Sequence, residues 1–202
     1  MKKKNLAMML SALETVHSST TLEQYTLPGD VAADILIYAY DFGDIDSRTV
    51  ADLGCGSGIL GVGALLLGAA GVVFVDCDSH AIEVARTNLE KATKDLKVGK
   101  IIFECSNIEN ATLTVDTVVQ NPPFGTRRKG ADMQFLKKAT EIAPVVYSLH
   151  KKGNADFLSQ HTHHTLTHVK DVTLPLYRSY PFHTRRVVEI EAELLRFEKV
   201  KI

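Results

Sequence analysis

The chain has 202 residues, a hydrophobic fraction of 45% and a formal net charge of -1 at pH 7. The near-neutral charge argues against a protein that coats nucleic acid non-specifically, and no apolar run reaches the ~18 residues that span a bilayer. Three cysteines without a paired C-x-x-C spacing indicate neither a disulfide framework nor a zinc site, and they fit a cytoplasmic protein.

The predicted elements begin with a helical N-terminal segment. A helix is expected near residues 4–14, a polar stretch follows over 17–26, and Pro28 opens a second helix that runs to about Tyr40. From Thr49 onward, short runs rich in Val and Ile alternate with longer amphipathic stretches, which is typical of β-α units and a mostly parallel sheet. Strands are predicted at 49–53, 71–76, 100–105, 116–120 and 145–149, and helices near 58–67, 79–93, 131–141 and 153–165.

Two further strand-like runs, 169–174 and 186–197, close the chain without a helical pattern between them. They predict an antiparallel hairpin on the sheet edge. In the last run apolar residues alternate with Glu189, Glu191 and Glu193, so one face is expected to be apolar and the other acidic, as in an edge strand. The expected fold class is α/β: a Rossmann-like, mostly parallel seven-stranded sheet with helices on both faces. Residues 1–202 are expected to form one domain, with residues 1–45 as a helical cap.

A glycine-rich loop follows the first predicted strand and opens a helix. Residues 51–58 read A-D-L-G-C-G-S-G, where glycines permit a tight turn and a close approach of the backbone to a ligand. A literal G-x-G-x-x-G also starts at Gly56, and Asp76 comes twenty residues later, which is the dinucleotide fingerprint. Asp52 favours S-adenosylmethionine, because a carboxylate there could hold a cationic amino-acid end and would repel a pyrophosphate. Asp76 is positioned for ribose hydroxyls in either cofactor.

The strand at 116–120 runs directly into Asn121-Pro122-Pro123-Phe124. The Asn121 side-chain oxygen and the Pro122 carbonyl can accept both hydrogens of a planar amine, which draws its nitrogen towards tetrahedral geometry and offsets the growing positive charge. The prolines stiffen the loop and hold Asn121 extended, and Phe124 can stack on a base. The motif fits three acceptors: an adenine amine, a cytosine amine or a glutamine side-chain amide.

These motifs resemble known families. D-L-G-C-G-S-G looks like the first motif of class I S-adenosylmethionine-dependent methyltransferases. Leu22-Glu23-Gln24-Tyr25, N-P-P-F-G-T from Asn121, Tyr147-Ser148-Leu149-His150-Lys151 and the late stretch 180–186 together resemble the small ribosomal RNA adenine-N6 methyltransferases of the methyltransferase-like 5 type. The resemblance covers essentially the whole chain, which is identified as an archaeal-type member of that family.

The resemblance implies a class I methyltransferase fold, S-adenosyl-L-methionine as cofactor, and methyl transfer to the N6 amine of an adenosine in RNA, above all in small-subunit ribosomal RNA. It also implies a heterodimer with a small zinc-ribbon activator protein that pairs with the sheet. The expected catalytic residues, which would hold a flipped adenine, are Asn121, Pro122, Pro123 and Phe124. The expected cofactor-binding residues are Gln24, Tyr25, Asp52, Gly54, Cys55, Gly56, Gly58, Ile59, Asp76, Cys77, Asn107, Ile108 and Asn121.

Charged and histidine-rich stretches bear on the substrate and on metal binding. Basic residues, expected along one rim at the carboxyl ends of the strands, could hold phosphates around an extruded base. They are Arg127, Arg128 and Lys129 after the catalytic loop, and the pairs Lys137 and Lys138, Lys151 and Lys152, and Arg185 and Arg186. His161, His164 and His168 would share a helical face, but no carboxylate or cysteine joins them, so no metal is expected.

The nearest alternative is a glutamine-amide (N5) protein methyltransferase of the release-factor type, which shares the N-P-P motif. Those enzymes usually carry tyrosine after the prolines and a separate N-terminal helical domain, and neither is present. A dinucleotide-binding oxidoreductase would not explain residues 121–124. A catalytically silent RNA-binding scaffold would not explain why the acceptor loop is intact.

Overall fold

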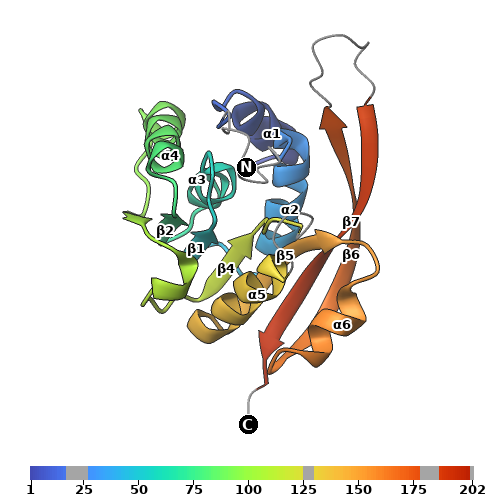
Figure 1. Cartoon of the computed structure of the whole chain (residues 1–202). Helices are drawn as coiled ribbons and strands as arrows, with labels where there is room; N and C mark the ends of the chain where they lie inside the picture. Colours follow the sequence, from blue (N-terminus) through green and yellow to red (C-terminus); the bar gives the residue numbers. More distant parts are fainter. Residues whose placement is uncertain (17–26, 125–129, 178–186, 201–202) are drawn as a thin grey trace.

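The computed structural model describes residues 1–16, 27–124, 130–177 and 187–200 (Figure 1). Its helices are α1 (Lys3–Ser11), α2 (Gly29–Asp41), α3 (Ile59–Leu66), α4 (Ser79–Thr93), the 3-10 helix η1 (Ile108–Asn110), α5 (Ala131–Ile142) and α6 (Ala155–Gln160). Its strands are β1 (Thr49–Leu53), β2 (Gly71–Asp76), β3 (Lys100–Cys105), β4 (Thr117–Gln120), β5 (Val145–Lys151), β6 (His164–Tyr177) and β7 (Val187–Lys199). Within the described ranges, no helix is long and apolar enough to cross a membrane.

The strands form one sheet in the order β3-β2-β1-β4-β5-β7-β6. The pairs among β1 to β5 are parallel, whereas β7 runs antiparallel to both β5 and β6. This arrangement confirms the α/β class, the seven-stranded sheet and the antiparallel C-terminal pair. The strand order reverses between β1 and β4, and ligands of open α/β sheets bind beyond the carboxyl ends of the strands at such a point.

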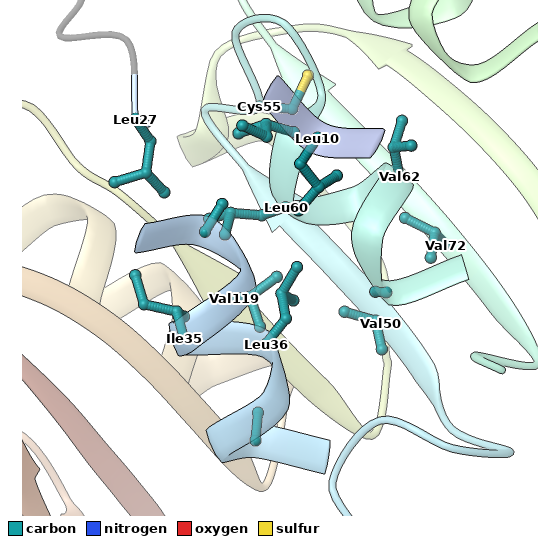
Figure 2. Packing of buried hydrophobic residues seen from close by; sticks show 14 of the residues in the cluster. Leu10, Leu27, Ile35, Leu36, Val50, Cys55, Leu60, Val62, Val72 and Val119 are labelled. Carbon is teal, nitrogen blue, oxygen red and sulfur yellow. The ribbon is translucent and has the colours of Figure 1, made fainter. Parts of the chain in front are cut away.

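Helices cover both faces of the sheet (Figure 1). On one face α1 to α4 pack in a cluster that includes Leu36 and Val119, and Figure 2 shows side chains of α1, α2 and α3 meeting those of β1, β2 and β4 there. On the other face α5 and α6 pack against Val118 and Phe197. Val118 and Val119 point to opposite faces because side chains alternate along a strand. Both faces are apolar, as expected for a buried parallel sheet.

The prediction for the stretch after β5 is wrong in part. A helix was expected over 153–165, but α6 ends at Gln160 and β6 already begins at His164, before the predicted start at residue 169. β-Branched Thr162, Thr165 and Thr167 favour a strand over a helix here. The shared helical face of His161, His164 and His168 therefore does not exist.

The prediction for β7 also needs correction, because this strand lies between β5 and β6 and the outer strand is β6. Glu189 and Glu191 are exposed, as an acidic outer face requires, but Glu193 is only 8% exposed and one of its carboxylate oxygens has no hydrogen-bond partner among the described residues. An alternation of apolar and polar residues cannot distinguish an inner strand from an edge strand, because the neighbours of a strand are set by the topology of the sheet.

Beyond the carboxyl end of β5, residues 187–191 pair with β6 alone among the strands, so the hairpin projects past that edge of the sheet (Figure 1).

A buried ion pair ties the segment between α2 and β1 to this hairpin. The Arg196 Nε of β7 donates to the Asp44 carboxylate at 2.9 Å, and the Tyr147 hydroxyl of β5 donates to the same carboxylate oxygen at 2.6 Å. Burial raises the pKa of Tyr147, and its hydrogen bond to Asp44 raises it further. A buried charge of this kind is costly unless it is paired, so the three groups fix the register of segments about 150 residues apart.

Candidate active site

Strand register brings the sequence-predicted motifs to one edge of the sheet. Leu53, the last residue of β1, is level with Val75 of β2 and with Gln120 of β4. The glycine loop after β1, Asp76 at the end of β2 and the loop after β4 therefore start side by side. Asn107 and Ile108 follow β3 at the same edge, with Asn107 exposed and Ile108 half-buried. The predicted site residues in the described ranges thus lie along one edge of the sheet, which includes the topological switch point between β1 and β4.

The glycine loop has a backbone that only glycine adopts readily. Gly54, Gly56 and Gly58 have φ angles of 67°, 52° and 77°, in the left-handed region. The amides of Gly54 and Cys55 both donate to the Val75 carbonyl, at 2.8 and 3.0 Å, which holds the loop over β2. A Cβ at Gly56 would meet nothing within 4 Å, so the loop leaves open space at its apex. An uncrowded, glycine-lined loop of this shape fits the backbone approach that a nucleoside cofactor requires.

Asp76 holds the glycine loop in place. Its Oδ2 accepts from the Gly56 amide at 2.8 Å and its Oδ1 accepts from the Asp78 amide at 3.0 Å. Burial raises the pKa of this carboxyl, while the hydrogen bonds from Asp78 and Gly56 oppose that rise. The side chain lies at the end of β2, where the sequence predicted a contact with ribose hydroxyls. Cys77, the next residue, is exposed at the same edge.

Asp52 has a different environment from the one that the sequence suggested. It is 2% exposed, and its Oδ2 accepts from the Gly61 amide in the first turn of α3 at 2.8 Å. Burial raises its pKa from 3.8 to about 8, and the nearby Asp76 carboxylate adds to this effect. A helix N-terminus offers unpaired amides that such a side chain satisfies. Asp52 therefore fastens α3 to β1, and its proposed role with a cationic ligand stays a prediction.

The remaining residues of the glycine loop are packed into the protein. Cys55 is buried and its pKa is raised by burial, so it acts as a small apolar side chain of the hydrophobic core cluster (Figure 2). Ile59 is buried as the first residue of α3. Phe135 of α5 lies against Gly54, since a Cβ there would come within 2.7 Å of the ring. Sequence reasoning did not identify Phe135, whose only signal is an aromatic residue on a helix.

The acceptor loop starts where β4 ends. Asn121 is half-buried, Pro122 is buried, and Pro123 and Phe124 are half-buried. Phe124 also packs against the core cluster under the cap helices. The predicted residues Gln24 and Tyr25, and the basic residues at 127–129 and 185–186, lie outside the described residues.

A buried polar row lies beside the acceptor loop, and sequence reasoning missed it. Gln120 Nε2 donates to Ser148 Oγ at 2.9 Å, and Ser148 Oγ is 2.6 Å from His150 Nε2. All three residues are at most 2% exposed. Burial lowers the pKa of His150 from 6.5 to about 4, against the opposing effect of the Asp132 carboxylate. The available signal was the presence of polar side chains in two otherwise apolar strands.

The possible ligands for a metal ion are the histidine, cysteine and acidic side chains. The described residues hold no group of three or more His, Cys, Asp or Glu side chains that could bind a metal ion. His164, once expected on a helix, is buried in β6 and its Nε2 lies 3.0 Å from the Ala143 carbonyl.

Comparison with known proteins identifies the family. Residues 25–165 match the model of the methyltransferase small domain. The rRNA N(6)-adenosine-methyltransferase METTL5 of Danio rerio is 35% identical over 87% of this chain and 88% of its own length. The chain belongs to the methyltransferase-like 5 family. An uncharacterised protein of Methanocaldococcus jannaschii is 37% identical over 98% of the chain and 95% of its own length. A crystal structure from Pyrococcus horikoshii, described as a candidate RNA methyltransferase, is 38% identical to this chain. It superimposes with a TM-score of 0.87 over 100% of this chain and 99% of that one.

Proposed function

We propose that this methyltransferase transfers a methyl group from S-adenosylmethionine to the N6 amine of an adenosine in RNA. The observation that carries the proposal is the position of the acceptor loop, which leaves β4 directly beside the glycine loop after β1. In that position the two loops would hold a methyl donor and a planar amine at the same edge of the sheet. The curated relative from Danio rerio, named an rRNA N6-adenosine methyltransferase, supports ribosomal RNA as the substrate.

The residues at this edge fit the cofactor. The open apex at Gly56 leaves room for a ligand close to the backbone, and Asp76 provides a carboxylate at the end of β2. Asn107 and Ile108 provide an amide and an apolar side chain after β3, suited to an adenine ring. The cofactor supplies an electrophilic methyl group on a sulfonium. We assign the protein's part of its binding to these four residues and to the flanking glycines Gly54 and Gly58.

The acceptor loop can activate a weak nucleophile. An aromatic amine reacts poorly because its lone pair is delocalised into the ring. The Asn121 side-chain oxygen and the Pro122 carbonyl would accept its two hydrogens, which localises the lone pair and stabilises the positive charge that grows on nitrogen. Phe124 would stack on the extruded base, a contact worth about 1 to 3 kcal/mol. No separate base is required, since the proton leaves readily once the nitrogen is cationic.

The proposal also includes a protein partner, a small zinc-ribbon activator that pairs with the sheet. β3 is an outer strand, and it pairs only with β2 among the described strands. Ile101 and Ile102 on this strand are 37% and 42% exposed, and Leu96 just before it is also exposed. An exposed apolar edge strand is a template for pairing with another chain. We place the activator along β3.

Methyl transfer from radiolabelled S-adenosylmethionine to ribosomal RNA that lacks the modification tests the function. The assay is run with and without the activator, and the RNA is then digested to nucleosides. The proposal expects label in N6-methyladenosine. Label in protein with none in RNA would favour the glutamine-amide methyltransferase instead.

A further inference from the structure

The pentapeptide Tyr147-Ser148-Leu149-His150-Lys151 has no role in the function described so far. Its residues alternate across β5: Tyr147 and Leu149 pack under the cap helices, whereas Ser148 and His150 point to the face covered by α5 and α6. Tyr147 is accounted for by its bond to Asp44. Ser148 and His150 are polar, buried and remote from solvent, so their presence calls for a separate explanation.

The direction of the hydrogen bonds in this row follows from the donors available. The amide nitrogen of Gln120 can only donate, so Ser148 Oγ accepts from it. The single hydroxyl hydrogen of Ser148 can then be donated to His150 Nε2, which accepts it in the tautomer that carries its hydrogen on Nδ1. Burial lowers the pKa of His150 to about 4, which favours the neutral ring that this bond needs.

Gln120 depends on this row for its orientation. Its Oε1 is buried and has no hydrogen-bond partner among the described residues, so the bond to Ser148 orients the amide. Gln120 is also the last residue of β4, and Asn121 follows it directly. A shift of the Gln120 backbone would therefore move Asn121, the next residue, together with its side-chain amide.

The Asp132 carboxylate in the first turn of α5 also acts on this row. Its charge favours a protonated His150 and so opposes the fall in the pKa of His150 that burial causes. The bond from Gln120 to Ser148 fixes the side chain at the end of β4, where the acceptor loop starts. A fixed start keeps the acceptor in place without a reorganisation during the reaction.

We propose that Ser148 and His150 are positioning residues of the methyl-transfer reaction, which hold Gln120 and through it aim the Asn121 amide at the acceptor nitrogen. Neither residue touches the substrate or the cofactor. This role rests on the proposed function, because it assumes that Asn121 binds the acceptor amine. It predicts an effect on turnover that is separate from cofactor binding.

Kinetics of Ser148→Ala test the proposal against a matched control. Thr117→Val removes a buried hydroxyl at the other end of β4, where Thr117 Oγ1 donates to the Asp44 carbonyl at 2.7 Å. Misplacement of a reacting group by ~1 Å can cost 10²-fold in rate, so a partial loss of aim should lower the kcat of Ser148→Ala about tenfold. Its Kd for S-adenosylmethionine should stay within about twofold. Thr117→Val should keep kcat, and Ser148→Thr, which retains the hydroxyl, should restore it.

Equal kcat losses in Ser148→Ala and Thr117→Val, measured where both are folded, would overturn the proposal, as would a folded Ser148→Thr that fails to restore kcat. His150→Phe adds a second test, since it removes the acceptor of the Ser148 hydroxyl. The double variant with Ser148→Ala should lose no more than either single variant, because the residues act as one row. Losses that multiply would mean that the two residues act independently.

Nuclear magnetic resonance of the Asn121 side-chain amide separates this inference from the proposed function. The signal should shift in Ser148→Ala and stay in place in Thr117→Val, whether or not RNA is the substrate. If wild-type protein fails to methylate RNA while the signal shifts, the proposed function fails and the positioning row stands. An unmoved signal in Ser148→Ala overturns the positioning row.

Discussion

Asn121 follows β4 and the glycine loop follows β1, so one substitution can separate activation of the acceptor from binding of the cofactor. Asn121→Ala should lower methyl transfer by at least about a hundredfold, the usual cost of removing one preorganised polar group that stabilises developing charge. The Kd for S-adenosylmethionine should change by less than about threefold. Transfer of radiolabel and titration calorimetry measure the two quantities. Asn110→Ala on the exposed η1 is the control, and a parallel loss of cofactor binding in Asn121→Ala would contradict this division of roles.

Asp52 gives a prediction with a defined pH dependence. Its folded pKa of about 8 exceeds the ordinary 3.8, so between these values the folded protein holds a proton that the unfolded chain has lost. The stability that Asp52 contributes is therefore complete below pH 3.8 and is lost as pH rises towards 8. Asp52→Asn keeps an oxygen that accepts from the Gly61 amide and cannot ionise. The variant should gain stability over the wild type as pH rises from 5 to 8.

Urea unfolding at pH 5, 6.5 and 8 checks this expectation. Asp52→Ala, which removes the acceptor, should be less stable than Asp52→Asn at every pH, by about 1 kcal/mol for a lost helix cap. A difference between wild type and Asp52→Asn that does not vary with pH would show that the carboxyl is ionised in the folded protein. The Kd for S-adenosylmethionine decides the sequence-based role, because a carboxylate that holds a cationic ligand cannot be replaced by an amide without a loss of affinity.

At the scale of the elements, α4 links the cofactor loop to the N-terminal segment through one buried side chain. Asn88 is fully buried, its Oδ1 accepts from the Glu14 amide at 2.7 Å, and its Nδ2 donates to the Glu14 and Ser57 carbonyls, both at 2.9 Å. Asn88→Ala would leave three backbone groups without partners, each costing about 1 to 3 kcal/mol if it stays buried. We expect a marked fall in unfolding free energy and a weaker Kd for S-adenosylmethionine, since Ser57 belongs to the glycine loop.

The control for Asn88 lies one helical turn further along α4. Lys91 forms an exposed ion pair with the Glu14 side chain, so Lys91→Ala should cost less than about 1 kcal/mol and leave cofactor affinity unchanged. Thermal unfolding with and without S-adenosylmethionine compares the two variants. If Asn88→Ala loses stability but keeps its cofactor affinity, Asn88 is a packing residue and does not support the glycine loop.

Which elements could be predicted depends on whether local sequence decides them. The strands β1, β2 and β3 and the helix α4 lie where predicted, because apolar runs and the Asp78 cap, which accepts from the His80 amide, mark their limits. The boundary between α6 and β6 was misplaced because the polar stretch around His161 has no clear periodicity. The burial of Glu193 could not be predicted, because it depends on β7 inserting between β5 and β6.

At the scale of the whole molecule, the motifs predict the position of the site but not what supports it. The glycine loop and the acceptor loop follow predicted parallel strands, and the carboxyl ends of such strands meet at one edge. No comparable rule predicts which polar side chains meet when they are distant in the sequence. Asp44, Tyr147 and Arg196, for example, come from segments about 50 to 150 residues apart. Their partners, like those of Ser148, become visible only once the strand order is known.

The two outer strands of the sheet make the position of the activator testable. Ile102 on β3 is 42% exposed and Val169 on β6 is 49% exposed, and these strands lie at opposite ends of the sheet. Ile102→Lys should abolish the complex with the zinc-ribbon activator, because a lysine on an edge strand opposes pairing with another chain. Val169→Lys should leave the complex intact. Neither variant should unfold the isolated chain, since both positions are exposed.

Size-exclusion chromatography of the co-expressed proteins measures the complex, and thermal unfolding of each isolated variant provides the folding control. A complex that survives Ile102→Lys but is lost in Val169→Lys would place the activator on the β6 edge, beside the part of the hairpin that projects past the carboxyl end of β5. In that arrangement the activator could contact the RNA directly. Binding along β3 instead places it next to the loop of Asn107 and Ile108, so its first effect should be on the affinity for S-adenosylmethionine.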